Sequence, residues 1–441
     1  MLLYWCIFLF VTFFAIKDWK KAVITWIPIR LLFNPCVCLK YTSPAVSLEL
    51  AIAAIFVILY FTRERNKKIY NNRKFFFKKA FIAYLISYLL SIIFSIVPFA
   101  TILTNTLKYF LEGFILLYLF QKALVNEIDI KLLIKTFAFV IILITLLGLY
   151  ESIFGDNPWL DYVFINAPLD LIRGKMYYVP PFMNTTGELS TRYGMIRGYS
   201  FFNIHIAYGC TCVLIYFFFM YILKIQKEYQ VKCHYIYILM LLGGILMCNS
   251  KTPYLGLIFF TFCFIRLKDV ISPKTFIGVI FIVGIISVYF PSYLNNFYGL
   301  FDDKLAQDGG GSSVALRTIQ FQIGLQMFEQ NPLFGNGVGA IEFMMSNNAK
   351  YAGLLGSESS WLKILPERGI VGVMAYLILY YTIYNQLKGF ISTKSVIFFL
   401  VGLMAMETAT GFMDLALYGA FIITIYRLYF IKQSVNYKKY E

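Results

Sequence analysis

Residues Ser312–Met344 read SSVALRTIQFQIGLQMFEQNPLFGNGVGAIEFM. This stretch places an arginine, several glutamines and a glycine-rich turn between two long apolar parts of the chain. Polar groups and irregular backbone are costly inside a lipid bilayer, so we expect the stretch to lie outside the hydrocarbon core. It indicates a structured outer loop, and the segments on either side of it are expected to be embedded in a membrane.

The composition predicts a polytopic membrane protein. Of the 441 residues, 60% are hydrophobic, 19% are aromatic and only 14% are charged, and the mean hydropathy is +0.70. These values lie well outside the range of soluble globular chains. Apolar runs of roughly 16–25 residues recur from end to end, and each could cross a hydrocarbon core of about 30 Å as a helix. We therefore expect one all-α integral membrane domain over residues 1–441, with no soluble domain left over.

The apolar runs predict about twelve or thirteen crossings. The first segment, MLLYWCIFLFVTFFAI, lacks the basic region and the cleavage site of a signal peptide and is expected to remain as a helix. Residues 22–40 contain prolines and an arginine, and they leave open a crossing, a re-entrant segment or an interfacial one. Further helices are expected near residues 47–62, 80–98, 102–121, 133–154, 199–223, 233–248, 253–265, 275–290, 360–384, 394–410 and 414–431.

Short basic loops fix the expected orientation. The formal net charge is +16, but the cations lie between hydrophobic runs, where the positive-inside rule accounts for them. We therefore expect no nucleic-acid partner. The strongest basic loop is RERNKKIYNNRKFFFKK (Arg63–Lys79), and those at residues 224–232, 266–274 and 386–394 agree with it. These loops and the C-terminus are predicted to be cytoplasmic, and the remaining long loops are predicted to lie outside.

Two long outer loops follow from this orientation, at residues 155–197 and 291–358. In the second loop, the segment from Ser313 to Gln330 has no helix breaker except Gly324, and its apolar residues recur at helical spacing. This pattern predicts a short amphipathic helix on the outer surface. The dipeptide Asn331-Pro332 is expected to end it.

The sequence GNGVG (Gly335–Gly339) admits two interpretations. It resembles a phosphate-cradling loop, but such a loop needs a strand before it and a helix N-terminus after it, with nucleotide on the cytoplasmic side. Neither condition is met. We expect a tight turn after the surface helix, and a backbone nest for an anion is the alternative.

Three cations are expected near the outer face. Arg317 lies in the second outer loop, Arg197 at the outer end of a helix, and Lys251 in a very short outer connection. A lone arginine beside a membrane often extends to the lipid headgroups. Three cations that converge could instead bind a pyrophosphate, for which the arginine fork is suited and lysine serves as a point charge.

Candidate acid and base residues on the outer side are few. His205 lies on the helix that follows Arg197, where packing or a hydrogen bond is the simpler role. Glu358 lies where an outer loop enters a helix, and Ser/Glu residues at such a position can simply cap the helix. Either residue could otherwise serve as a general base.

Four further charged residues fall inside or beside predicted helices. Lys108 and Glu112 are four residues apart and could pair with each other, as intramembrane charges generally must. Glu407 and Asp414 flank the turn of the last hairpin, where sugar binding and interfacial solubility are both open.

The eight cysteines lie almost entirely in apolar runs, and no Cys/His group has the spacing of a zinc site. We interpret them as small buried hydrophobic residues and expect no metal or other cofactor.

Four segments between Arg197 and Gly372 recur together in one known group of enzymes. They read RGYSFFNIHIAYG, NSKTPYLG, RTIQFQIGLQMFEQNPLFGNGVGAIEF and ESSWLKILPERGIVG. In this order they resemble the O-antigen polymerase and O-antigen ligase superfamily, integral membrane glycosyltransferases of the GT-C type that act on glycans carried by undecaprenyl pyrophosphate. The third segment is the most specific, since the family repeats an arginine, a helix and a Pro-Leu-Phe-Gly-x-Gly-x-Gly-like turn. The resemblance implies that this outer loop engages the lipid pyrophosphate.

The chain departs from the family pattern at three places. Ile204-His205 stands where the family often has Pro-Asn, and Ser250-Lys251 where it often has Ser-Arg, which keeps the charge but loses the fork. Ligases characteristically carry His-Asn where this chain has Glu358-Ser359. The missing histidine favours a polymerase.

The resemblance implies a polysaccharide polymerase for O-antigen or capsule, in the bacterial inner membrane with its active site facing the periplasm. Arg197, Arg317 and Lys251 would stabilise the leaving pyrophosphate, and Glu358 or His205 would act as the base. The implied partners are an undecaprenyl-pyrophosphate-linked oligosaccharide, the bilayer, a chain-length regulator and a flippase.

Two alternatives remain open at this point. A ligase would deliver finished glycan to lipid A core. A flippase or other transporter of lipid-linked oligosaccharide would move its substrate without chemistry. Transporters usually place their polar groups near the midplane in broken helices, whereas the candidates here are expected at the outer ends of helices.

Overall fold

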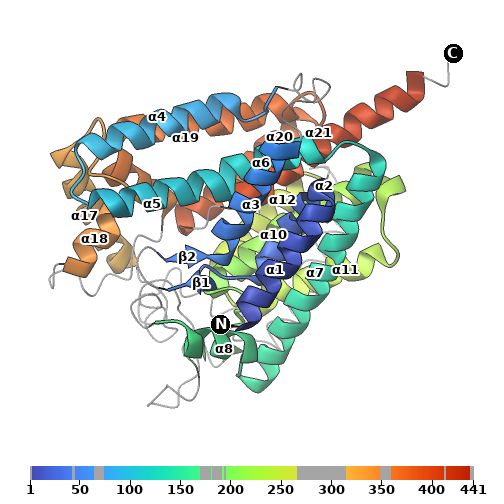
Figure 1. Cartoon of the computed structure of the whole chain (residues 1–441), viewed down its shortest axis with the longest axis horizontal. Helices are drawn as coiled ribbons and strands as arrows, with labels where there is room; N and C mark the ends of the chain where they lie inside the picture. The colour runs from blue at the N-terminus through green and yellow to red at the C-terminus, as the bar shows by residue number, and fades with distance from the viewer. Residues whose placement is uncertain are drawn as a thin grey trace, which may run out of the picture.

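The predicted helices that fall within the described residues form close to where the apolar runs place them. The computed structural model describes residues 2–41, 45–63, 74–168, 180, 191–192, 195–265, 314–347, 359–411 and 414–437. Within these residues the chain is almost entirely α-helical (Figure 1). The helix expected near residues 275–290, Glu358 and much of both outer loops lie outside the described residues.

The N-terminal part places a short helix, a 3-10 turn and one strand of a hairpin over residues 22–40. Helix α1 (Leu2–Lys17) is followed by α2 (Trp19–Ile29), whose N-cap Asp18 accepts a hydrogen bond from the Lys21 N–H at 3.1 Å. An 11-residue helix is only about 16 Å long, too short to cross the hydrocarbon core. The chain continues through a 3-10 turn (Arg30–Leu32) into a small antiparallel hairpin, β1 (Cys38–Lys40) and β2 (Val46–Ser47), and then into α3 (Leu48–Arg63).

The next helices follow the expected order. Helix α4 (Lys78–Ile93) precedes one long helical segment made of α5 (Phe99–Tyr109), the π-helical turn η3 (Phe110–Ile115) and α6 (Leu116–Ala123). Helix α7 (Glu127–Phe154) begins with a capping box formed by Asn126 and Asp129 and ends at Gly155, whose φ of 73° is left-handed. Helix α8 (Pro158–Asn166) follows.

The C-terminal half contains the remaining described elements. A two-stranded ladder, β3 (Thr191–Arg192) with β4 (Met195–Ile196), precedes α10 (His205–Ile225), the 3-10 turn η5 (Lys227–Tyr229), α11 (His234–Met247) and α12 (Lys251–Phe262). The remaining described helices are α17 (Val314–Gln330) and α18 (Ala340–Asn347), both within residues 291–358, followed by α19 (Ser360–Leu387), α20 (Thr393–Ala409) and α21 (Leu415–Tyr437).

Three described helices are long and apolar enough to cross a membrane. They are Phe99–Ala123, Glu127–Phe154 and His205–Ile225, and shorter apolar helices cover Leu2–Lys17, His234–Met247 and Leu415–Ile431. The all-α prediction for a membrane protein therefore agrees with the structure. The total of twelve or thirteen crossings stays a prediction.

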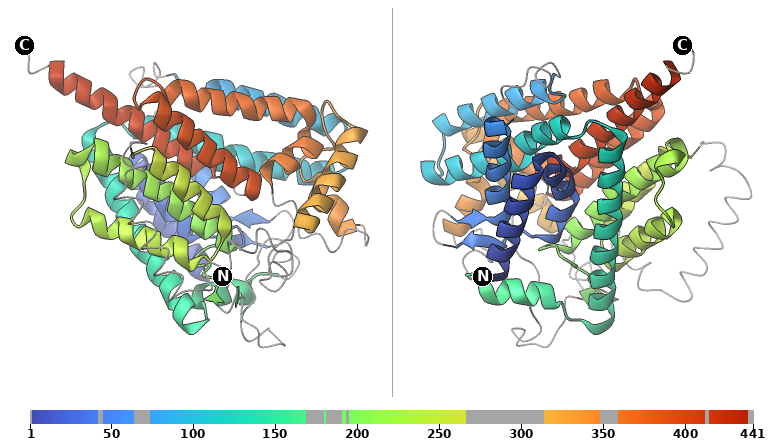
Figure 2. Two further views of the ribbon diagram at one scale, coloured as in Figure 1. Left: turned by 180° about the vertical axis from the view of Figure 1, so that it is seen from behind. Right: turned by 45° about the vertical axis from the view of Figure 1, so that its right-hand side comes forward.

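Two groups of helices pack together. Helix α4 lies along α19, with α5 close to them, and the long α7 packs on α2 and α11 (Figure 1). Helix α10 lies between α11 and α12, and most of its side chains from Tyr208 to Leu223 are buried. Figure 2 shows α10, α11 and α12 together on one side of the molecule and α17 and α18 at its far end.

Helix α17 corresponds to the helix expected over residues 313–330. It packs against α19, and its buried face includes Gln320, Gly324 and Met327. The side chains of Ile319 and Phe321 are exposed instead. Apolar residues therefore lie on both faces of α17. Packing against α19 decides which of the two faces is buried.

Helix α19 is broken near its N-terminal end. Gly369 has a φ of 59° and a ψ of −158°, three residues after Pro366. A proline lacks an N–H, and a non-helical residue interrupts the hydrogen-bond ladder, so backbone groups around the break need other partners. We call residues Pro366–Val371 the α19 break.

The glycine turn, residues Asn331–Gly339, supplies those partners. Asn331 ends α17 as expected, and the side chain of the fully buried Asn336 donates to the Met327 carbonyl at 2.6 Å. Four backbone hydrogen bonds join the glycine turn to the α19 break: Asn336 N to Pro366 O (2.9 Å), Gly337 N to Glu367 O (3.0 Å), Ile370 N to Pro332 O (2.9 Å) and Val371 N to Leu333 O (3.2 Å). The tight-turn interpretation of GNGVG is thus confirmed, and the Gly339 N–H faces the chain's own Glu367 carboxylate.

Two glycines make this contact possible. Gly335 has a φ of 73°, and a Cβ there would lie 2.3 Å from the Glu367 carbonyl carbon. A Cβ at Gly369 would lie 2.5 Å from the Leu333 carbonyl carbon. Both positions need a left-handed backbone and leave no room for a side chain.

We expect Gly335→Ala and Gly369→Ala each to lower the free energy of unfolding by about 2–4 kcal/mol, because each adds a left-handed penalty and a clash with backbone. Unfolding of the purified protein in detergent measures the loss. Gly389→Ala is the control, since a Cβ there meets nothing within 4 Å. Equal, small losses for all three variants would contradict the description of the turn.

Candidate functional site

The segment that carries Arg197 is folded onto the ends of α7 and α11. The Gly198 N–H donates to the Met247 carbonyl at 2.9 Å. The Glu151 carboxylate, near the end of α7, accepts from the Tyr199 N–H at 2.8 Å and from the Ser200 N–H at 2.9 Å. Since Glu151 is buried, with 2% of its surface exposed, these bonds fix the backbone that follows Arg197.

Asn157 and Ser200 complete this turn. The Asn157 side-chain amide donates to Glu151 Oε2 at 3.0 Å and to the Ser200 carbonyl at 2.8 Å. Ser200 has a φ of 54°, a left-handed value that is uncommon outside glycine. The hydrogen bond that its N–H donates to Glu151 and the one that its carbonyl accepts from Asn157 hold this strained residue in place.

Two of the three predicted cations come from this corner of the molecule. Lys251 is the first residue of α12 and follows a tight turn after Met247, which is the residue that holds Gly198. Burial raises the pKa of the Cys248 thiol to about 12, and the Ser250 backbone and the Arg197 guanidinium oppose that rise. Arg197 thus lies within electrostatic reach of the connection that leads into Lys251.

His205 lies beside the same segment. It is the first residue of α10, is 8% exposed and meets the Tyr199 ring edge to face, with 5.3 Å between the ring centroids. The packing role considered from the sequence is therefore present. The position also places the imidazole next to the backbone that carries Arg197.

Arg317 comes from a different part of the fold. Its helix, α17, packs on α19 at the end of the molecule away from α11 (Figures 1 and 2). Glu358 lies outside the described residues, but the next residue, Ser359, is the N-cap of α19 and accepts from the Leu362 N–H at 3.4 Å. The capping role considered for Glu358 is thus filled by its neighbour.

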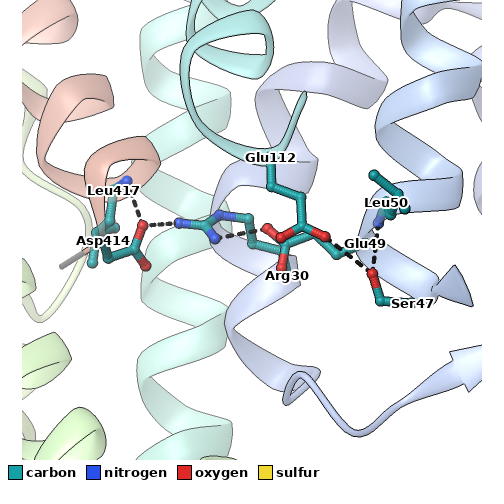
Figure 3. A network of polar contacts seen from close by, with 7 residues as sticks. All are labelled: Arg30, Ser47, Glu49, Leu50, Glu112, Asp414 and Leu417. Carbon is teal, nitrogen blue, oxygen red and sulfur yellow. Dashed lines mark hydrogen bonds and ion pairs between the residues drawn. The ribbon is translucent and has the colours of Figure 1, made fainter. Parts of the chain in front are cut away.

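Sequence reasoning missed a buried ion network centred on Arg30 (Figure 3). Arg30 follows α2 and is 9% exposed. Its guanidinium donates to Glu49 at 2.8 Å and forms a second ion pair with Asp414. Asp414 in turn accepts from the Leu417 N–H at 3.0 Å and so begins α21. One arginine therefore joins the ends of α2, α3 and α21.

Glu112 extends the polar contacts beside this network. It accepts a hydrogen bond from the Ser47 hydroxyl at 3.0 Å (Figure 3). Lys108 and Glu112 attract each other electrostatically, as the sequence suggested. Glu112 itself lies in the π-helical turn η3, and its printed hydrogen bond is the one to the hairpin residue Ser47.

Two other charged groups are held by tyrosines. The Glu407 carboxylate, 3% exposed, accepts hydrogen bonds from the Tyr376 and Tyr380 hydroxyls. This burial rules out interfacial solubility as its role. The Arg368 guanidinium, at the α19 break, lies 5.0 Å from the centre of the Tyr84 ring and 4.7 Å from that of Tyr88. These are cation–π distances.

Charged side chains other than the predicted site residues also lie inside helices. Glu112 lies in the middle of the Phe99–Ala123 helix, and Glu367 and Arg368 lie at a break inside α19. The sequence did carry a signal for the second case, because LPERG combines a proline, two charges and a glycine. It carried none for Arg30, whose partner Asp414 is 384 residues away.

Comparison with protein families supports the resemblance at a coarse level. Residues 236–377 match the family model described as O-antigen ligase. The match covers roughly a third of the chain, from α11 into α19, and includes Lys251, Arg317 and Glu358. A comparison with curated proteins finds no match. These findings support a membrane protein related to the O-antigen ligase superfamily and do not separate ligase from polymerase.

We expect Arg30→Ala to lower the free energy of unfolding by about 3–5 kcal/mol, because it leaves two partly buried carboxylates without their counter-ion. Unfolding in detergent, followed by tryptophan fluorescence, measures the change. Lys21→Ala is the control: Lys21 pairs with Asp18 at 3.1 Å, but 54% of its side chain is exposed, so less than about 1 kcal/mol should be lost. If Arg30→Ala were as mild as the control, the network would not be a structural anchor.

Proposed function

We propose that the protein is a polysaccharide polymerase that transfers a growing glycan from undecaprenyl pyrophosphate to a lipid-linked repeat unit at the outer face of a bacterial inner membrane. The observation that carries this proposal is the grouping of Arg197, His205 and the start of α12, which bears Lys251, around a turn held by Glu151. The family match over residues 236–377 gives the class of chemistry.

The proposed reaction is a displacement at the anomeric carbon of the donor sugar. An acceptor hydroxyl oxygen forms a bond to that carbon while the bond from the carbon to the pyrophosphate oxygen breaks. The pyrophosphate leaves with the bonding electron pair and stays on the undecaprenyl carrier. The hydroxyl proton passes to a base on the protein.

The cations have a clear task in such a step. Negative charge develops on the leaving oxygen, and fixed donors in a water-poor site stabilise it most in the transition state. Arg197 can offer two parallel N–H donors and Lys251 a compact charge. Arg317 is proposed to reach the same lipid pyrophosphate from the other long outer loop. Glu358 or His205 is proposed as the base.

A ligase is the second candidate, because the matching family model is described as O-antigen ligase. The same cations and the same leaving group would serve, and only the acceptor would differ. The characteristic histidine of ligases is replaced here by Glu358, and this substitution favours the polymerase. The two enzymes leave different products in a strain that lacks the protein.

In a strain that lacks this protein, we expect glycan limited to one repeat unit on its final acceptor, because chain growth has stopped while the repeat units are still made. Gel analysis of lipopolysaccharide and capsule measures the length. A ligase would instead leave long polymer on the undecaprenyl carrier, and a flippase would leave repeat units facing the cytoplasm. Long polymer on the final acceptor, with no second polymerase encoded, would contradict the proposal.

We expect Arg317→Ala to slow chain extension roughly 100- to 1000-fold, as loss of one donor to a developing anion does elsewhere. Arg317→Lys should recover part of the rate, because it keeps the charge without the fork. Arg197→Ala and Arg197→Lys should behave in the same way. The assay is extension of lipid-linked repeat units by purified protein at matched expression, with the exposed Lys388→Ala as the control cation.

The base is tested in the same assay. Glu358→Gln keeps the size of the side chain and removes the base, so extension should cease while the protein still folds. Loss of a helix cap alone would cost only about 1 kcal/mol of stability, and Ser359 already caps α19. Near-normal extension by Glu358→Gln would transfer the proposed role to His205, which His205→Gln would then test.

A further inference from the structure

A cavity lies at the end of the molecule that carries the loop of residues 224–232. It has a volume of about 440 Å³ and is bounded by α7, by the connection between α10 and α11, and by the first turn of α11. The basic loops predict that this end faces the cytoplasm. It is the opposite end of α7 from Glu151, so the cavity is separate from the proposed reaction site.

One wall of the cavity changes from cationic to apolar along a single face of α7. Lys131 and Lys135 lie one turn apart near the start of the helix, and Ala138, Phe139 and Ile142 follow on the same face. The distance along the helix from Lys131 to Ile142 is about 16 Å, close to the depth of one leaflet of a bilayer. Phe139 is 54% exposed on a helix that is long and apolar enough to cross a membrane.

The opposite wall adds a third lysine and a phenol. Lys232 and Tyr229 line the cavity from the α10–α11 connection, and Lys131 Nζ lies 5.9 Å from the centre of the Tyr229 ring. Burial, together with the nearby carboxylates of Glu127 and Glu228, raises the pKa of Tyr229 to about 12. Its hydroxyl is therefore protonated at neutral pH and hydrogen-bonds the Glu127 carboxylate.

The acidic residues around the cavity do not cancel its charge. Glu228 lines the cavity and is exposed. Glu127 lies 3.9 Å from Lys131, and both side chains are about half exposed, at 45% and 54%. Three lysines thus face one carboxylate inside the cavity and one at its edge.

We propose that this cavity binds an anionic glycerophospholipid from the adjoining leaflet. The phosphate would lie among Lys131, Lys135 and Lys232, and an acyl chain would run along Phe139 and Ile142. Charge at the membrane surface and apolar side chains below it match a lipid more closely than a free anion or an acidic peptide, since neither of these would use the apolar end. The inference does not depend on the proposed reaction.

Native mass spectrometry of the purified full-length protein tests the site. With matched acyl chains, phosphatidylglycerol should bind about 10-fold more tightly than phosphatidylcholine, because lysines near an anionic headgroup each contribute roughly a few-fold. The variant with Lys131→Gln and Lys135→Gln should lose most of this preference. Ile142→Trp, which fills the apolar end, should weaken the binding of both lipids.

The control carries Lys224→Gln and Lys227→Gln, which remove two exposed charges from the same region outside the cavity. It should retain the lipid preference. Equal binding of the two lipids by the unmodified protein, or the same loss in the control, would overturn the proposal. Displacement of phosphatidylglycerol by inorganic phosphate or by a polyglutamate peptide at comparable concentration would overturn it as well, because either result would show that the apolar end is not used.

Discussion

A polar group enclosed by apolar helices is stable only with a partner from the chain itself, and this constraint organises the irregular parts of the structure. Where α19 breaks, the glycine turn satisfies its backbone and Arg368 rests on tyrosine rings. Where α2 ends, Arg30 forms ion pairs with Glu49 and Asp414, which lie at the starts of two other helices. Breaking such a buried pair costs several kcal/mol, so these contacts fix how helices remote in sequence are placed against one another.

The same constraint explains how the backbone that follows Arg197, in the proposed reaction site, is held in place. The Glu151 carboxylate accepts hydrogen bonds from the backbone that follows Arg197. The Asn157 amide donates both to that carboxylate and to the carbonyl of the strained Ser200. Neither residue needs to touch a substrate. A cation intended for a leaving group must be held in position before the charge develops, and a backbone fixed at both ends provides that. In the second long loop, residues 291–358, the glycine turn is joined to α19 by four backbone hydrogen bonds.

The sequence predicted most helices because hydrophobic runs and breakers are local signals. The tight GNGVG turn and the end of α17 at Asn331 followed from residue type alone. Long-range partners did not follow, since nothing near Arg30 points to Asp414, and nothing near Glu112 points to its hydrogen-bond partner Ser47. Of the predicted site, Arg197, His205 and the start of α12 come from one corner, Arg317 lies on a separate helix, and Glu358 is outside the described residues.

Reconstitution with a defined substrate would show whether the isolated protein carries out the proposed glycosyl transfer. The purified protein would be placed in vesicles with an undecaprenyl-pyrophosphate-linked repeat unit as the only glycan, and undecaprenyl pyrophosphate and glycan length would be measured together. We expect one released undecaprenyl pyrophosphate for each repeat unit added, and loss of both signals in Arg197→Ala. Movement of the lipid-linked unit across the bilayer without release of the carrier pyrophosphate would contradict it.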